Sequence, residues 1–204
     1  MKLLHIDSSI LGDHSVSRQL TAAIIARLQE VTPDLDVSHR DLAANPLSHL
    51  SGALLAASAP GAPAPDPSTQ AALGESAAIL AEFLAADIVV VGAPMYNFAI
   101  SSQLKAWIDR LVIAGKTFRY ADGAVEGLAG GRRLIIASSR GGVFEAGAAA
   151  AALDYQETYL RAIFGFIGIA DVEIIRAEGL AFGEDARALA IKQAGDAILR
   201  LEAA

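Results

Sequence analysis

The sequence predicts an α/β protein with an open, doubly wound sheet of five parallel strands in the order 2-1-3-4-5 and helices on both faces. Short runs rich in Val, Ile and Leu alternate with longer segments of helical spacing, which is the order typical of βαβ units. The run Ile88 to Val91, followed by Gly92, is apolar without alternation, as in a central strand covered on both faces. Ligands of such sheets bind beyond the carboxyl ends of the strands, where the strand order reverses.

The expected elements follow one another along the chain as alternating strands and helices. Strands are expected at 3–7, 36–40, 88–92, 133–137 and 172–177. Helices are expected from about Ser17 onward, up to about Ala86, at 101–114, through an alanine-rich stretch to about Phe166, and at 185–201. The segment 117–123 resembles a small hairpin.

A proline-rich loop separates the second strand from the next helix. Because proline fixes φ and lacks an N–H, no regular element accommodates this stretch, and we expect the loop to end at Ser68 or Thr69 as a helix cap. Such a loop is typical of a flap, a partner contact or a mobile insertion rather than a domain linker. Residues 1–204 are therefore expected to form a single domain. The prolines are Pro60, Pro63, Pro65 and Pro67.

Composition excludes several classes of protein. The chain has 204 residues, of which 53% are hydrophobic, and its net charge of −7 argues against nucleic acid or an anionic membrane as a partner. The absence of cysteine excludes disulfides, iron–sulfur clusters and a cysteine nucleophile. The first apolar run is interrupted by His5 and Asp7 and cannot form a signal-peptide core, and no run is long enough to span a bilayer. We therefore expect a cytoplasmic protein.

The loop after the first strand carries hydroxyl groups ahead of a helix. Ser9, Ser15 and Ser17, with free N–H groups at the helix N-terminus, suit a phosphate, and Arg18 adds a positive charge nearby. On this loop alone, a plain helix cap is the favoured interpretation. The loop matches neither the dinucleotide-binding glycine fingerprint nor the P-loop pattern.

The loop after the central strand combines two aromatics, a thioether and an amide. Large apolar side chains beside an amide suit a flat heteroaromatic ring such as a flavin, although the same residues could belong to the core, with Pro94 ending the strand. The loop after the fourth strand, 138–144, contains the pair Gly141-Gly142, which lets the backbone approach a ligand closely. Three such loops at one sheet edge indicate one shared ligand site.

Five blocks of the sequence, taken together, resemble the FMN-dependent NADH:azoreductases, flavodoxin-like relatives of the quinone reductases. The blocks are Asp41 to Pro46, Ala93 to Phe98, Gly115 to Tyr120, Ser139 to Gly142 and Gly165 to Gly168. The resemblance implies a flavodoxin-like fold and a homodimer whose subunits each bind one FMN tightly at the interface. It also implies ping-pong hydride transfer from NADH or NADPH to FMN and then to a small aromatic acceptor, a quinone or an azo compound. No side chain is expected to act as an obligatory nucleophile.

The same resemblance assigns roles residue by residue. The phosphate would be held by Ser9, Ser15 and Ser17, with Val16 at a position where relatives often have a polar residue. The isoalloxazine ring would be lined by Met95, Tyr96, Asn97 and Phe98, and at its other edge by Ser139, Arg140, Gly141 and Gly142. The substrate pocket would be walled by Tyr120 and Phe166 from the opposite subunit and by Phe144, which together with the alanines of 146–152 replaces more polar sequence.

Two other functions stay open on the sequence alone. One is a flavin-binding electron carrier or redox sensor without its own nicotinamide turnover, and the other is a regulatory domain that retains only the fold. A hydrolase is disfavoured because no nucleophile elbow is present. No metal site is expected, since the histidines show no metal-ligand spacing along the chain. They are His5, His14, His39 and His49.

Overall fold

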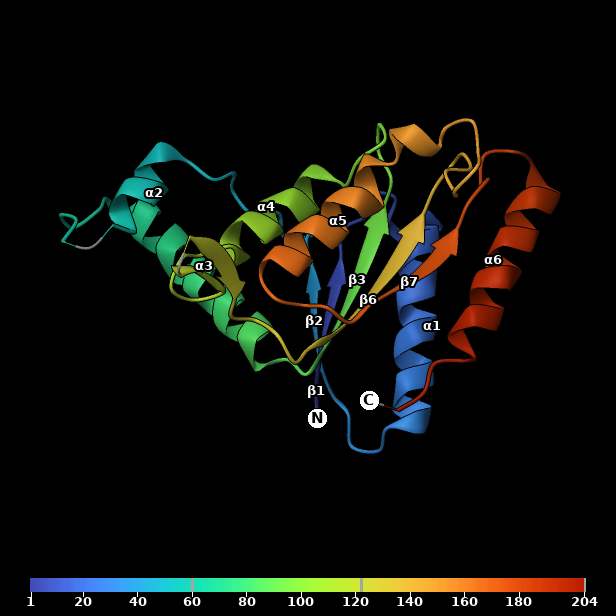
Figure 1. Cartoon of the computed structure of the whole chain (residues 1–204), viewed down its shortest axis with the longest axis horizontal. Helices are drawn as coiled ribbons and strands as arrows, with labels where there is room; N and C mark the ends of the chain where they lie inside the picture. The colour runs from blue at the N-terminus through green and yellow to red at the C-terminus, as the bar shows by residue number, and fades with distance from the viewer. Residues whose placement is uncertain (60, 122, 204) are drawn as a thin grey trace.

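The structure is a computed structural model that describes residues 1–59, 61–121 and 123–203. Pro60 of the expected proline-rich loop and Asp122 of the expected hairpin lie outside the described residues. The molecule is built on a five-stranded parallel sheet in the order β2-β1-β3-β6-β7, which confirms the predicted 2-1-3-4-5 order (Figure 1). The strands are β1 (Lys2–Asp7), β2 (Asp36–Asp41), β3 (Ile88–Pro94), β6 (Arg133–Ser139) and β7 (Val172–Ala177).

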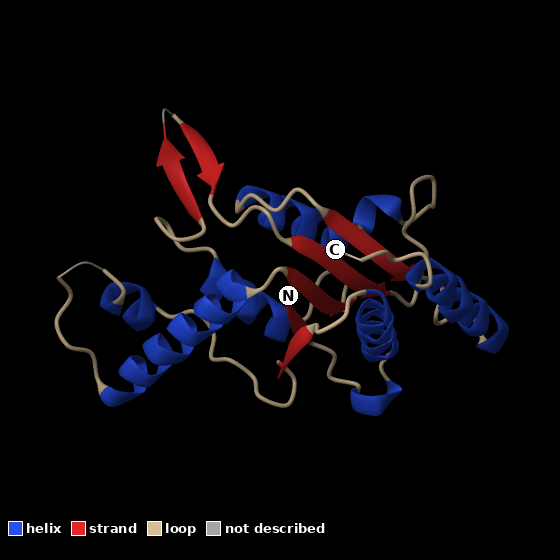
Figure 2. Ribbon diagram, turned by 90° about the horizontal axis from the view of Figure 1, so that it is seen from below, coloured by secondary structure: helices blue, strands red, loops and turns tan. Residues whose placement is uncertain are grey.

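Helices cover both faces of the sheet, and a small hairpin projects from the body (Figures 1 and 2). One face carries α1 (Val16–Val31) and α6 (Glu184–Ile198). The other carries α3 (Pro67–Ala85), α4 (Ser102–Leu111) and α5 (Tyr155–Phe166). The remaining elements are α2 (Gly52–Ala57), the hairpin strands β4 (Phe118–Ala121) and β5 (Ala124–Gly127), and the 3-10 helices η1 (Gly12–His14) and η2 (Ala151–Leu153).

Strand β3 lies at the centre of two hydrophobic cores. All of its residues are buried, and its side chains alternate between the two faces of the sheet. Val89 and Val91 pack in the core under α3, α4 and α5, whereas Ile88 and Val90 pack in the core under α1 and α6. Each such side chain contributes roughly 1.5–3 kcal/mol by its burial. This two-sided burial explains why the strand is apolar without alternation.

Helix α3 begins earlier than the sequence analysis expects. Its N-cap is Asp66, not Ser68 or Thr69, and the Asp66 carboxylate accepts hydrogen bonds from the main-chain N–H groups of both residues at 2.9 and 3.1 Å. Pro67 is therefore not part of the loop but the first residue of the helix, where its missing N–H costs no hydrogen bond. The hydrogen bonds from Ser68 and Thr69 lower the pKa of the Asp66 carboxyl.

Two further expectations about elements are wrong. The alanine-rich stretch 146–150 is not helical, and α5 begins only at Tyr155, after the cap Asp154 accepts from the Glu157 N–H at 2.9 Å. Gly147, at φ +93°, has a backbone conformation that a right-handed helix excludes. Conversely, α2 forms in the segment expected to be irregular, because Ser51 caps it and Leu54 is buried. Within the part of the chain that is described, no helix has the length and apolarity needed to cross a membrane.

Candidate functional site

The loops after β1, β3 and β6 meet at the carboxyl edge of the sheet around a cavity of about 200 Å³. Hydrogen-bond contacts join them: the Tyr96 hydroxyl lies 3.2 Å from Ser9 Oγ and accepts from the Ile10 N–H at 3.3 Å, and the Met95 N–H donates to the Ser139 carbonyl at 2.8 Å. The convergence that the sequence predicts is therefore present. Eight of the predicted cofactor-binding residues line the cavity: Ser9, Ser15, Val16, Met95, Tyr96, Ser139, Arg140 and Gly141.

The first loop presents the N-terminus of α1 to the cavity. Ser15 is the N-cap, and its Oγ accepts from the Arg18 N–H at 3.3 Å. Ser17 does not line the cavity; its buried hydroxyl lies 3.0 Å from Ser15 Oγ and so contacts the residue that does. The free N–H groups and the dipole of a helix N-terminus favour an anion at this position.

The positive charge beside the first loop differs from the one expected. The Arg18 side chain does not line the cavity. Its Nη1 and Nη2 donate to the two Asp41 carboxylate oxygens at 2.7 and 2.8 Å, and Nη2 also donates to the Ser9 carbonyl at 2.9 Å. This pairing lowers the pKa of Asp41 to about 2. Arg187 of α6 lines the cavity instead and makes no ion pair with any described residue. No sequence motif marks Arg187, since only the packing of α6 beside α1 brings it to this edge.

The second loop is a tight turn with a strained backbone. Tyr96 and Ala99 exchange main-chain hydrogen bonds at 2.9 and 3.0 Å, and the two residues between them have left-handed φ values, 48° at Asn97 and 70° at Phe98. Such a conformation costs a non-glycine residue on the order of 1–3 kcal/mol and tends to occur at functional sites. Asn97 and Phe98 do not line the cavity within one chain, and Phe98 is 44% exposed beside it.

The third loop is anchored by a buried arginine. The Arg140 side chain is 1% exposed and points into the protein, where Nη1 lies 3.0 Å from both Asp154 Oδ2 and Glu178 Oε1, and Nη2 contacts Glu157. Its Nε also donates to Gln156 Oε1 at 3.1 Å. Arg140 thus lines the cavity, but its guanidinium forms ion pairs with carboxylates from α5 and its N-cap and from the segment after β7.

The same network positions the residues that follow Arg140. Glu178 Oε1 accepts from the Phe144 N–H at 3.0 Å, and the Phe144 ring packs edge-on to Phe98 with centroids 6.1 Å apart. A Cβ on Gly142 would approach this ring at 3.1 Å, so glycine suits the position. Gly142 and Phe144 adjoin the cavity without lining it.

The two remaining substrate-pocket candidates lie in another part of the chain. Phe118 packs against both Tyr120 and Phe166, with centroid separations of 5.6 and 4.8 Å. This aromatic group sits where the projecting hairpin meets the C-terminal end of α5, away from the carboxyl edge (Figures 1 and 2). Within one chain, Tyr120 and Phe166 therefore do not join the cavity, and Tyr120 is 76% exposed.

Comparison with known proteins places this architecture in a family. The family model of the flavodoxin-like fold matches residues 1–201. The chain belongs to this flavodoxin-like family. The FMN-dependent NADH:quinone oxidoreductase of Methylorubrum populi is 58% identical to this chain over 205 residues, covering 100% of both sequences. A Bradyrhizobium diazoefficiens protein, named FMN-dependent NADH:quinone oxidoreductase 2, is also 58% identical, over 204 residues and 100% of both chains.

Solved structures agree with the flavodoxin-like assignment. An FMN-dependent NADH-azoreductase of Bacillus anthracis, in complex with FMN, superposes with a TM-score of 0.87 at 26% identity, covering 98% of each chain. An azoreductase from the same species gives a TM-score of 0.86 at 26% identity, covering 98% of this chain and 100% of the other. The resemblance stated from the sequence blocks is therefore confirmed, and so is the flavodoxin-like topology.

Proposed function

We infer that this flavodoxin-like protein is an FMN-dependent NADH:quinone oxidoreductase that also reduces azo compounds. The observation that carries the inference is the meeting of three loops at one cavity, with hydroxyl groups and a helix N-terminus at one end and Met95, Tyr96 and Gly141 at the other. The names of the 58%-identical relatives supply the donor and acceptor classes.

The residues around the cavity fit FMN. The phosphate end of FMN is an anion, and it would meet Ser9, Ser15, the N-terminus of α1 and the guanidinium of Arg187, which has no ion-pair partner among the described residues. No aspartate or glutamate is among the described residues that line the cavity, so no carboxylate would repel the phosphate. The apolar surfaces of Met95 and Tyr96 suit the faces of the flavin ring.

When bound, FMN supplies the hydride chemistry, accepting a hydride from NADH and delivering it to the acceptor. The chain supplies position and electrostatics. Tyr96, held by Ser9, fixes the second loop against the first. The main-chain N–H groups of Asn97 and Gly141 donate to no acceptor among the described residues and are free to hydrogen-bond the ring edge, where they would stabilise negative charge. Donor and acceptor would bind in turn beside the residues that line the cavity.

Reduction by NADH separates an enzyme from an electron carrier. The purified protein loaded with FMN should lose its flavin absorbance when mixed with NADH without oxygen, and should regain it on addition of a quinone. A carrier without nicotinamide turnover would stay oxidised after mixing. The proposal fails if NADH leaves the spectrum unchanged while dithionite reduces the bound flavin.

Two features support a homodimer with sites completed across its interface. An apolar groove of about 630 Å³ lies between α4 and α5, lined in part by Ala99, Ile100 and Tyr159, and it continues directly from the Met95–Phe98 loop. The hairpin projects from the body and exposes Tyr120, so the aromatic group with Phe118 and Phe166 is available to a second copy (Figure 2). Apolar patches of this kind mark association surfaces.

The oligomeric state tests this part of the proposal. Light scattering should report twice the mass of the chain for the FMN-loaded protein. Tyr120→Ala should slow quinone turnover more than it weakens FMN binding. Tyr120 does not line the cavity of its own chain, and in the proposed dimer it would wall the substrate pocket of the second copy. A monomer with full activity would contradict the shared site.

A further inference from the structure

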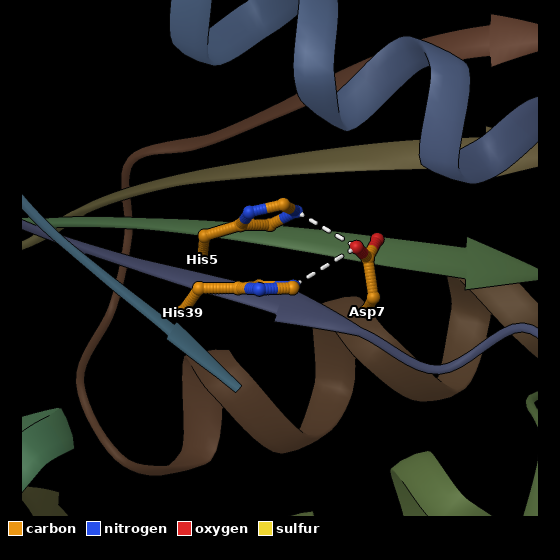
Figure 3. A group of neighbouring side chains, drawn as sticks. All are labelled: His5, Asp7 and His39. Carbon is orange, nitrogen blue, oxygen red and sulfur yellow. Dashed lines mark hydrogen bonds and ion pairs between the residues drawn. The ribbon is translucent and has the colours of Figure 1, made fainter. Parts of the chain in front are cut away.

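Two histidines and an aspartate gather on the α1 side of the sheet, apart from the cavity. His5 on β1 pairs in register with His39 on the neighbouring strand β2, and Asp7 is the next residue of β1 on the same face. The two imidazole rings stack with centroids 4.2 Å apart, and both point their Nε2 atoms at Asp7 (Figure 3). Parallel pairing brings together residues that lie far apart in sequence, which is why their spacing along the chain gives no metal signal.

We propose that His5, Asp7 and His39 form a site for one divalent transition-metal ion of the zinc type. Asp7 Oδ2 lies 3.2 Å from His5 Nε2 and 3.1 Å from His39 Nε2, and the three ligand atoms all lie within 4.8 Å of one another. In a tetrahedral zinc site with bonds of ~2.0–2.1 Å, ligand atoms are separated by ~3.3–3.4 Å. The observed separations from Asp7 are within a few tenths of an ångström of that value.

Hydrogen bonding alone leaves this cluster unsatisfied. His39 Nε2 hydrogen-bonds Asp7 Oδ2 at 3.1 Å. The buried His5 Nε2 lies 3.2 Å from the same oxygen but has no hydrogen-bond partner among the described residues. A cation placed between the three atoms would satisfy it. The other Asp7 oxygen, Oδ1, accepts from the Thr21 hydroxyl at 3.0 Å, an outer contact that orients the carboxylate with Oδ2 toward the two imidazoles. A metal ion would replace the hydrogen bond between His39 Nε2 and Asp7 Oδ2.

The charge and exposure around the cluster also suit a cation. Arg18 Nη1 lies 3.6 Å from Asp7 Oδ2, but its guanidinium is paired through two hydrogen bonds with Asp41, so two carboxylates face one guanidinium. The His39 side chain is 47% exposed, which gives an ion a route in and leaves water access to a fourth position. Two imidazoles with one carboxylate favour zinc, nickel or copper over magnesium or calcium.

The site is separate from the proposed flavin site but close to it in the chain. None of its three residues lines the cavity, yet Asp7 precedes the Ser8-Ser9 segment, and Arg18 donates to the Ser9 carbonyl. A bound ion would therefore stabilise the first loop through Asp7 and Arg18 without contacting a reacting group. We expect metal binding to raise the free energy of unfolding and to leave the residues that line the cavity in place.

The experiment measures zinc binding to tag-free, full-length protein, after chelator treatment and dialysis, by competition with a chromophoric chelator. The wild type should take up one Zn²⁺ per chain. His39→Gln and His5→Gln should each bind at least about tenfold more weakly. His49→Gln is the matched control, because His49 is an exposed histidine outside the cluster, and it should bind like the wild type.

Two further readouts do not depend on enzymatic activity. Saturating zinc should raise the thermal unfolding midpoint of the wild type and of His49→Gln, but not of His39→Gln. Cobalt(II) added to the wild type should give ligand-field absorption of a low-coordinate site, which zinc should abolish. Equal zinc affinity in the wild type and His39→Gln, or a wild type with no tight zinc and no such cobalt spectrum, would overturn the proposal.

Discussion

Arg140 is the side chain on which the position of the third loop depends, and its replacement by methionine is the sharpest structural test. Arg140→Met keeps the apolar stem and removes the charge. Glu157 would keep a partner, since both its oxygens also accept from Arg176 at 2.6–3.0 Å. Asp154 and Glu178 have no other ion pair among the described residues, and their side chains are 15% and 13% exposed.

The cost follows from these exposures. Breaking a buried ion pair from one side costs about 3–5 kcal/mol, and because water reaches part of both orphaned carboxylates, we expect the lower end, about 3 kcal/mol. The Gly141 to Phe144 segment should loosen with it, since Glu178 also holds the Phe144 N–H. The variant should therefore bind FMN more weakly than the wild type.

Urea unfolding of the FMN-free protein measures the free energy of unfolding. Quenching of flavin fluorescence during titration with the protein measures the dissociation constant for FMN. Arg119→Met is the control: it removes an arginine whose partner, Glu126, lies on the exposed hairpin, and it should leave both quantities nearly unchanged. If Arg140→Met unfolds at the same urea concentration as Arg119→Met and binds FMN equally well, the reasoning about the buried network is refuted.

Three other changes test separate parts of the structure. Ser15→Ala should cost about 1 kcal/mol of stability through loss of the α1 cap, and should weaken FMN binding about tenfold through loss of a hydrogen bond to a charged group; an unchanged dissociation constant for FMN would contradict the phosphate role. Gly127→Ala would place a Cβ against the backbone of Gly168, and should lower stability by roughly 1–3 kcal/mol in thermal unfolding; a variant as stable as the wild type would show that the hairpin packs differently. The folded-state pKa of Asp41, about 2, lies below its ordinary value of 3.8 because of Arg18, so its contribution to stability is fully present above that ordinary value and is lost as the pH falls towards 2. Asp41→Asn should therefore lose less stability than the wild type over this acid range, and parallel acid-unfolding curves would contradict the pairing.

Local pattern was sufficient for the sheet because its strands are buried on both faces or bounded by clear turns. The expected bounds of β7 agree with the structure, and those of β1, β2, β3 and β6 differ by at most two residues at an end. The start of a helix is less predictable where a capping side chain or a glycine conformation overrides the helix propensity of the neighbouring residues. Asp66 captures two N–H groups beside a proline, and Gly147 keeps a run of good helix formers from being helical.

The site divides in the same way. Topology alone predicts that residues just after a strand lie at the cavity. Ser9, Tyr96 and Gly141 are of this kind. The role of the Arg140 side chain, the approach of Arg187 and the pairing of His5 with His39 could not. Each depends on which elements pack side by side, a tertiary property that no local spacing encodes.

A crystal structure of the protein with FMN bound tests the central claim most directly. We expect density for the phosphate at Ser15, the α1 N-terminus and Arg187, and density for the ring between Tyr96 and Gly141. A flavin located elsewhere, or a carboxyl edge closed against it with these loops unchanged in the presence of saturating FMN, would contradict the account.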